Sequence, residues 1–405
     1  MHPVYRAALA LILCVVLPGC WNRTELNEIG IASASGFDRS GEDWVGSFQI
    51  IVPSAMASGT TGGGGGGGGN SPAINVHSVK GQTIMEAASL SNLENPRRLY
   101  FAHNNVVIIG KEAAEKGVGQ LIDLYLRNAE SRETVLLLLT EQKASEMLRK
   151  LLPPEKIAGA GIAEILRKEK DLTSMFAPVT VFDVANKMIN TDTKAIGVPV
   201  IAVSGGTDHD NETDLESMDA FKKTSPTQKI KLVKLGIFHN NRLVGWMDRK
   251  ESRGLNWMTD KVNGTLLAIS SSASNRKPNI SLTIVSSKTT VHPVKQGEKY
   301  VMNVNVKAKG DLNESGGKLM LTDRNVLLEL EEQAEREIES EIKAGWKAMR
   351  RLGVDAAGFT DSIHRRMPAD WKQMKGDWKA VFDKMELNVR VQVTIKRQGL
   401  IQNSY

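Results

Sequence analysis

Cysteine is scarce in this sequence, with two residues, Cys14 and Cys20, among 405. Cys14 lies inside an apolar stretch at 7–17, and Cys20 follows that stretch directly after Pro18-Gly19. If the stretch is removed during secretion, a single cysteine remains, which excludes an internal disulfide. Cys20 therefore needs another explanation.

Long hydrophobic runs are also absent. The stretch at 7–17 is too short for a membrane-spanning helix, which needs about 20 apolar residues. Arg6 precedes it and small residues end it, which is the layout of a secretory signal. We therefore predict that residues 1–19 form a signal peptide outside the fold. A later apolar run at 135–139 predicts a buried strand.

The end of this signal, Leu-Pro-Gly-Cys, resembles a bacterial lipobox. In such sequences the cysteine receives a diacylglycerol and becomes the first residue of the mature protein. Acyl chains contribute about 0.8 kcal/mol per buried methylene, so they hold a folded domain on a membrane without a spanning helix. The alternative is an ordinary free thiol after a conventional signal. We predict lipidation at Cys20, because acylation accounts for the leftover thiol.

The sequence lacks the local patterns of catalytic and metal sites. Its seven histidines show no i, i+4 pair and no zinc-like spacing with cysteine, and there is no Gly-x-Ser-x-Gly elbow. We expect His103 to be a structural histidine whose ring nitrogens have hydrogen-bond partners, either buried or at a strand edge. Acidic clusters at 331–332 and 335–337 alternate with basic residues, which is typical of a solvated helix face. We predict no enzyme activity, no cofactor and no metal.

Strong charge of one sign is missing too. The formal net charge is +6, with 41% hydrophobic and 24% charged residues. This composition is that of a globular protein able to bury large cores. The mild positive bias is compatible with a position near anionic lipid and too weak to indicate nucleic-acid binding.

The first half alternates strand and helix patterns. A hairpin is predicted from two runs, 29–37 and 44–52, with turn residues between them. Further strands are expected at 99–110 and 135–140, and helices at 83–92, 121–127, 144–152, 157–167 and 181–190. Strands separated by helices predict a mixed α/β or α+β region with a mixed sheet over residues 20–203.

Two segments interrupt these patterns. Gly62–Gly69 is a run of eight glycines without the Lys-Ser or Lys-Thr pair of a phosphate-binding loop. We expect a flexible surface loop at 57–71. Residues 204–228 are polar and acidic in their middle, which predicts a linker or an exposed hairpin loop at a domain boundary.

The second half, 229–405, predicts an α+β domain. A hairpin is expected at 230–246 around Asn240-Asn241, followed by a helix opened by Asp248 and Glu251 as a capping box. A long helix is expected from Thr322 to Leu352, with an apolar stripe formed by Leu330, Ala334, Ile338, Ile342 and Trp346. We predict that this helix crosses an antiparallel sheet, and that most tryptophans of this half lie in the core.

Several segments in unchanged order give the chain a family resemblance. They are "GCWNRTELNEIGI", "KGQTIMEAA", "FAHNNVVIIGKEAAEKGVGQLIDLYLRNAESR", "LGIFHNNRLVGWMDRKESRGLNWM", "VLLELEEQAEREIESEIKAGWKAMRRLGVDAAGF" and "PADWKQM". Together they resemble the Ger(x)C family of spore germination lipoproteins, the C subunits of nutrient germinant receptors. The resemblance covers nearly the whole mature chain, and the glycine run departs from it in a loop.

The resemblance implies a non-enzymatic protein tethered by Cys20 to the outer face of the spore inner membrane. It implies membrane-spanning A and B subunits as partners, and three mixed α/β domains that divide the first half near residue 194. It implies no site residue besides Cys20, and it leaves open whether this subunit binds the germinant. The alternative is a solute-binding lipoprotein of a transporter. Such a protein would present two repeated βαβ lobes around a cleft, and the strand-rich second half of this chain shows no such repetition.

Overall fold

The computed structural model describes residues 28–53, 72–205, 215–225, 227–270, 278–316 and 323–397, together with the single positions 3 and 55. Cys20, the predicted signal peptide apart from Pro3, and the glycine run lie outside these residues. The predictions made for them are therefore carried forward as predictions.

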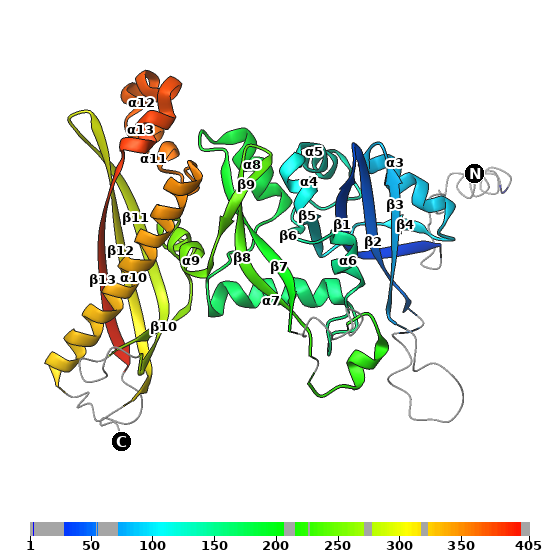
Figure 1. The fold of residues 1–405 in the computed structure, drawn as a ribbon, viewed down its shortest axis with the longest axis horizontal. Helices are drawn as coiled ribbons and strands as arrows, with labels where there is room; N and C mark the ends of the chain where they lie inside the picture. The colour runs from blue at the N-terminus through cyan, green and yellow to red at the C-terminus, as the bar shows by residue number, and fades with distance from the viewer. Residues whose placement is uncertain are drawn as a thin grey trace.

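Within the described ranges the fold is mixed α+β with two sheets, as predicted from the sequence (Figure 1). A nine-stranded sheet has the order β3-β2-β1-β5-β6-β7-β8-β9, with β4 paired to β1. Its strands are β1 (Ile29–Ser40), β2 (Asp43–Ile51), β3 (Ile74–Gly81), β4 (Arg98–Tyr100), β5 (Val106–Gly110), β6 (Leu136–Thr140), β7 (Ala195–Ser204), β8 (Lys229–His239) and β9 (Arg242–Met247).

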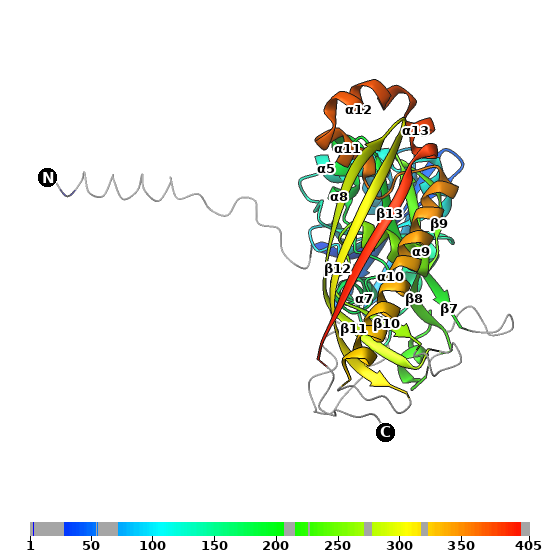
Figure 2. The same cartoon turned by 90° about the vertical axis from the view of Figure 1, so that its left-hand side faces the viewer.

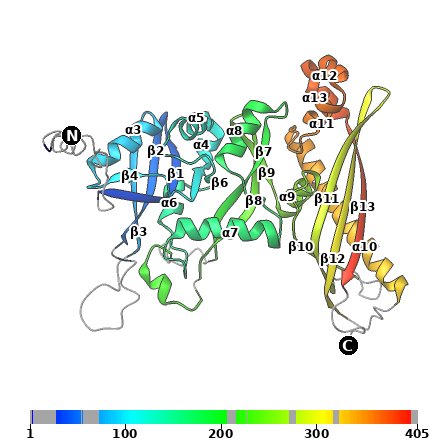
Figure 3. The same ribbon diagram turned by 180° about the vertical axis from the view of Figure 1, so that it is seen from behind.

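Helices cover both faces of this large sheet (Figure 3). They are α3 (Ile84–Leu90), α4 (Lys111–Lys116), α5 (Gly119–Arg127), α6 (Ala144–Arg149), α7 (Ala158–Leu172) and α8 (Val181–Asn190). The central strands β5 and β6 run parallel, and β5 is buried throughout. Val107 and Ile109 face the core under α3, α4, α5 and α8, whereas Val106 and Ile108 face α6 and α7. A parallel strand buried on both faces explains the continuous apolar sequence.

The small sheet has the order β10-β11-β12-β13 and carries one long helix (Figure 2). Its strands are β10 (Thr265–Ile269), β11 (Ile280–Gln296), β12 (Lys299–Ser315) and β13 (Glu386–Arg397); the helices of this half are α9 (Arg249–Met258), α10 (Arg324–Leu352), α11 (Phe359–Arg366), α12 (Pro368–Met374) and α13 (Trp378–Lys384). The predicted stripe on α10 is confirmed: Leu330, Ala334, Ile338 and Ile342 are buried, and its last member, Trp346, is half-buried against the same core.

The prediction of a wholly antiparallel small sheet is wrong for its last strand. β13 pairs with β12 in parallel, from Val301 with Glu386 to Gly310 with Ile395. The reason is the connection: α10 carries the chain back along the sheet, so β13 starts at the same end as β12. A helical crossover of this kind is what joins parallel strands.

The large sheet continues across the predicted boundary at 204–228. β7 and β8 pair antiparallel, from Ala195 with His239 to Ser204 with Lys229. The described part of the segment between them contains a short 3-10 helix, Met218–Lys222, and buries Leu215 and Ala220. The two strands are thus the arms of a hairpin, and the segment between them is the hairpin loop that the sequence predicted as one of two possibilities. The division into domains stays a prediction.

Local capping signals are confirmed at several helix ends. Thr83 accepts a hydrogen bond from the backbone N–H of Glu86, and Asp248 with Glu251 forms a full capping box. Gly353 ends α10 in the left-handed conformation, with φ of 66°. The N-cap of α10 is Asp323, one residue after the predicted Thr322, which lies outside the described residues.

The strand predicted at 99–110 is broken in two. β4 ends at Tyr100 and β5 begins at Val106, because Asn104 turns inward and donates hydrogen bonds to the Ser35 hydroxyl and the Tyr125 hydroxyl, both at 3.0 Å. His103 lies in this turn and is exposed. The expectation of a buried or strand-edge histidine is therefore wrong.

Candidate binding cavity between the two sheets

The one site residue predicted from the sequence, Cys20, lies outside the described residues, so its lipidation stays a prediction. In the described ranges, no helix is both long and apolar enough to cross a bilayer. The same ranges contain no group of three or more His, Cys, Asp or Glu side chains that could hold a metal ion.

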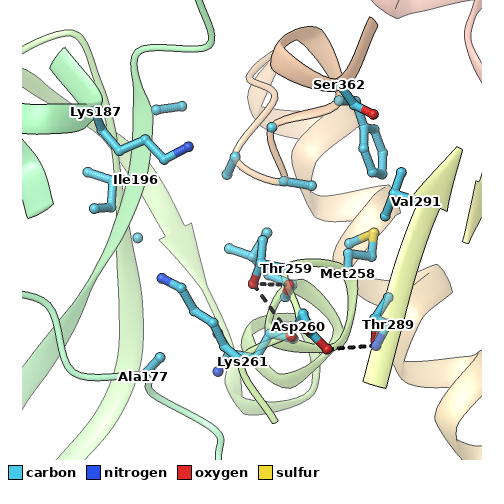
Figure 4. Close-up of a pocket in the computed structure, with 18 of the residues that line it drawn as sticks. Ala177, Lys187, Ile196, Met258, Thr259, Asp260, Lys261, Thr289, Val291 and Ser362 are labelled. Carbon is cyan, nitrogen blue, oxygen red and sulfur yellow. Dashed lines mark hydrogen bonds between the residues drawn. The ribbon is translucent and has the colours of Figure 1, made fainter. Parts of the chain in front are cut away.

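A cavity of about 750 Å³ lies between the large sheet and the small-sheet half (Figure 4). One wall is formed by β7 and β8, through Ile196 and Leu235 among others. The opposite wall consists of β11, at 288–291, the turn before α11, at 356–358, and the first residue of α11, Phe359. The connection from α9 to β10, at 258–261, forms the floor between the two walls.

Polar contacts close one end of this cavity. Asp361 on α11 accepts hydrogen bonds from the backbone N–H of Asp192 at 2.9 Å and from the Thr193 hydroxyl at 3.1 Å. The ammonium of Lys187 lies 3.5 Å from the same carboxylate. These contacts tie α11 to the connection between α8 and β7.

A second set of contacts fixes the floor to the end of α7. The Ser174 hydroxyl donates to the carbonyl of Gly264 at 2.8 Å, and the Asn256 amide donates to the carbonyl of Ser174 at 2.9 Å. Ser174 and Asn256 are both buried. The two halves of the molecule are therefore joined on both sides of the cavity.

Two buried carboxylates hold the segments that carry these contacts. Glu169 accepts the backbone N–H of Phe176 at 2.7 Å, and burial raises the pKa of its carboxyl. Asp355 accepts the backbone N–H of Phe359 at 3.1 Å and that of Thr360 at 2.7 Å. Burial also raises the pKa of Asp355. Each carboxylate replaces water around backbone N–H groups that would otherwise lack partners.

Basic side chains dominate the charged lining of the cavity. Five basic residues line it, against the single acidic residue Asp260: Lys187, Lys261, Lys288, Arg365 and Arg366. Lys288 is paired with Asp260 at 2.5 Å, and Arg365 donates to the carbonyl of Asp361 at 3.2 Å. Lys261 and Arg366 form no ion pair with any residue in the described ranges. The cavity therefore carries a surplus of positive charge.

The surroundings of Lys261 shift its pKa. Its side chain extends from the floor toward the wall that carries Ile196 (Figure 4). The side chain as a whole is exposed in the open cavity. Partial desolvation lowers the pKa of Lys261; the charge of Asp183 opposes this shift, and the charge of Lys187 adds to it.

The rest of the lining is largely apolar. Ile196, Leu235, Leu255, Met258 and Phe359 contribute to it and are buried. No histidine, cysteine or tyrosine is among the described residues that line the cavity. The arrangement can bind a small molecule by charge and apolar contact, and it presents no paired nucleophile and base.

None of the basic residues of the cavity was singled out from the sequence. They come from α8, the α9–β10 connection, β11 and α11, so no local spacing links them. Only the packing of the two halves brings them together. A basic pair at the end of a helix, as at 365–366, is by itself common near helix C-termini.

Two family models match separate parts of the chain. The family described as "Spore germination protein N-terminal domain" matches residues 22–203. The family described as "Spore germination B3/ GerAC like, C-terminal" matches residues 234–399. The class of protein is therefore that of spore germination proteins built from these two regions.

Whole-chain relatives agree with this class. The chain is 30% identical over 402 residues to "Spore germination protein KC" of Bacillus subtilis (strain 168), covering 98% of this chain and 96% of that protein. It is 21% identical over 405 residues to "Spore germination protein B3" of the same organism, covering 99% and 100%. The crystal structure of the GerBC protein shares the fold, with a TM-score of 0.54 and 18% identity over 89% of this chain and 96% of that one.

The chain belongs to the GerAC-like family of spore germination proteins, the Ger(x)C family that the sequence resembled. The prediction of the family is confirmed. The family consists of germinant receptor subunits and is not known for enzymes.

Proposed function

We propose that this protein is the lipid-anchored C subunit of a nutrient germinant receptor. Cys20 carries the lipid and holds the folded part at the outer face of the spore inner membrane. There the protein assembles with membrane-spanning A and B subunits to trigger germination. The observation that carries this proposal is the 30% identity to a curated spore germination protein over 98% of the chain.

The distance between anchor and fold supports a role in assembly. Seven residues separate Cys20 from Glu28, the first residue of the main described range. Even fully extended, the eight residue steps from Cys20 to Glu28 span at most about 29 Å. A tether this short raises the effective concentration of membrane partners to about the millimolar range, which turns weak contacts into a stable complex.

The solute-binding alternative is less well supported. A solute-binding lipoprotein of the kind considered above would have two repeated lobes around its cleft. Here one side of the cavity belongs to a nine-stranded sheet and the other to a four-stranded sheet with one long helix. The cavity is compatible with a ligand, but its two walls are not repeats of one unit.

Replacing Cys20 by alanine tests the anchor. In an endospore-forming host fed an alkyne fatty acid, we expect the wild-type chain to be labelled and to sediment with membranes. The Cys20→Ala variant should be unlabelled, and most of it should leave the membrane fraction. Cys14→Ala is the matched control, because it removes the other cysteine and should leave labelling unchanged. Equal labelling of Cys20→Ala and wild type would contradict the proposal.

A further inference from the structure

We propose that the cavity between the two sheets binds a small organic carboxylate, whose negative group pairs with Lys261 and Arg366. This inference concerns the folded part alone and does not depend on the anchor or on the receptor partners. It rests on the charge of the cavity, its apolar lining and its position between the two halves.

The charge of the cavity is incompletely balanced by the protein. Asp260 is engaged by Lys288, and Asp361 by Lys187 and the backbone of Asp192. Asp183 lies near Lys261 and belongs to the capping box of α8. Lys261 is exposed within the cavity and forms no ion pair in the described ranges, and an anion within about 4–6 Å favours the charged form of a lysine. A bound anion therefore supplies the counter-charge that these ranges do not provide.

The apolar lining narrows the class of anion. Val291 and Ala357 also line the cavity, and both are only half-buried. An inorganic ion would leave these two side chains in contact with water, whereas a carboxylate with a hydrocarbon body covers them. The volume of about 750 Å³ lies within the range of about 300–1,000 Å³ that is usual for small-molecule sites.

The position of the cations gives the ligand a structural effect. Lys261 lies on the floor, while Arg366 belongs to α11 and Lys187 to α8. A carboxylate paired with Lys261 and Arg366, which both belong to the second half, faces the wall that β7 of the first half forms. Because it binds the folded state, it stabilises the joined arrangement in proportion to its concentration relative to its dissociation constant.

Calorimetric titration of the full lipidated chain in detergent tests this inference. The probes are acetate, butyrate, benzoate, succinate and glutarate. Butyramide, benzamide and glutaramide are the matched uncharged compounds, and inorganic phosphate is the matched anion without an apolar part. We expect at least one carboxylate to bind at least tenfold more tightly than its amide and than phosphate. Its affinity should fall as sodium chloride is raised, because the pairing is electrostatic.

Variants locate the binding. Lys261→Gln and Arg366→Gln should each weaken that carboxylate at least tenfold. Lys379→Gln is the matched control: it removes the same charge from an exposed position on α13, outside the cavity, and should bind as wild type does. Circular dichroism without ligand should be the same for all three, since Lys261 and Arg366 both keep solvent contact.

Three results would overturn the inference: no carboxylate of the panel binds, phosphate binds as tightly as the best carboxylate, or the two cavity variants bind as the control does. None of these results bears on lipidation at Cys20. Loss of labelling in Cys20→Ala, in turn, says nothing about the cavity. The two proposals therefore fail separately.

Discussion

Replacing Glu341 by glutamine is expected to lower the free energy of unfolding by about 3–5 kcal/mol, the usual cost of removing one partner from a buried ion pair. Glu341 lies on α10 and is fully buried. Its carboxylate accepts hydrogen bonds from Arg253 Nε and Trp257 Nε1, both at 2.8 Å, and a further one from Arg253 Nη2. Glutamine would leave the Arg253 guanidinium, 14% exposed, without a counter-charge.

Urea denaturation followed by tryptophan fluorescence measures this loss, since Trp257 contacts the altered group directly. Glu339→Gln is the matched control. Glu339 is on the same helix and pairs with Lys343 at 2.6 Å on the exposed surface, where such pairs contribute about 0.2–1 kcal/mol. A loss below about 1 kcal/mol for Glu341→Gln would show that the buried pair does not hold α9 to α10.

The second large effect is expected from Gly254→Ala, where α9 crosses α10. A Cβ atom at Gly254 would lie 1.9 Å from the carbonyl oxygen of Glu341 and 2.9 Å from the backbone nitrogen of Gly345. Both atoms belong to the backbone, so no change of rotamer relieves the overlap. Overpacking commonly costs about 1–3 kcal/mol, and this case should reach about 3 kcal/mol. It should outweigh the gain of about 1 kcal/mol in helix propensity.

Gly376→Ala is the control for this substitution. A Cβ atom there meets nothing within 4 Å, so its midpoint of unfolding should stay close to that of wild type. Thermal unfolding of the two variants side by side gives the comparison. Equal midpoints would mean that the two helices do not approach each other backbone to backbone.

Both substitutions also concern the cavity. The residues at 258–261 that form its floor follow directly from α9, and α9 is positioned by the contacts of Arg253, Gly254 and Trp257 with α10. A loosened α9 would displace Lys261. The helix crossing thus links the stability of the second half to the geometry of the candidate site.

Much of the fold could be predicted because it is encoded locally. The capping residues Asp248 and Glu251 and the terminal Gly353 set helix ends through contacts within one turn. Alternating apolar residues identify the strands of the second half. That alternation says which residues face the helix, but it carries no information about the direction of a neighbouring strand, so the parallel pairing of β13 with β12 was missed.

The candidate cavity could not be predicted for a related reason. Lys187 and Arg366 are separated by most of the second half of the chain, and neither belongs to a motif. Each alone is an ordinary surface cation. Cys20 is the opposite case: its lipidation is predicted from the contiguous residues Leu-Pro-Gly-Cys, which resemble a lipobox, so sequence alone suffices to predict it.

We propose that this protein acts as an anchored subunit of a receptor complex. Affinity purification of the tagged, lipidated protein from detergent-solubilised spore membranes, followed by mass spectrometry, tests this proposal. We expect two membrane-spanning partners to co-purify with the wild-type chain, and to be lost or reduced with Cys20→Ala. Recovery with an ATP-driven permease, or with no membrane protein, would contradict the claim.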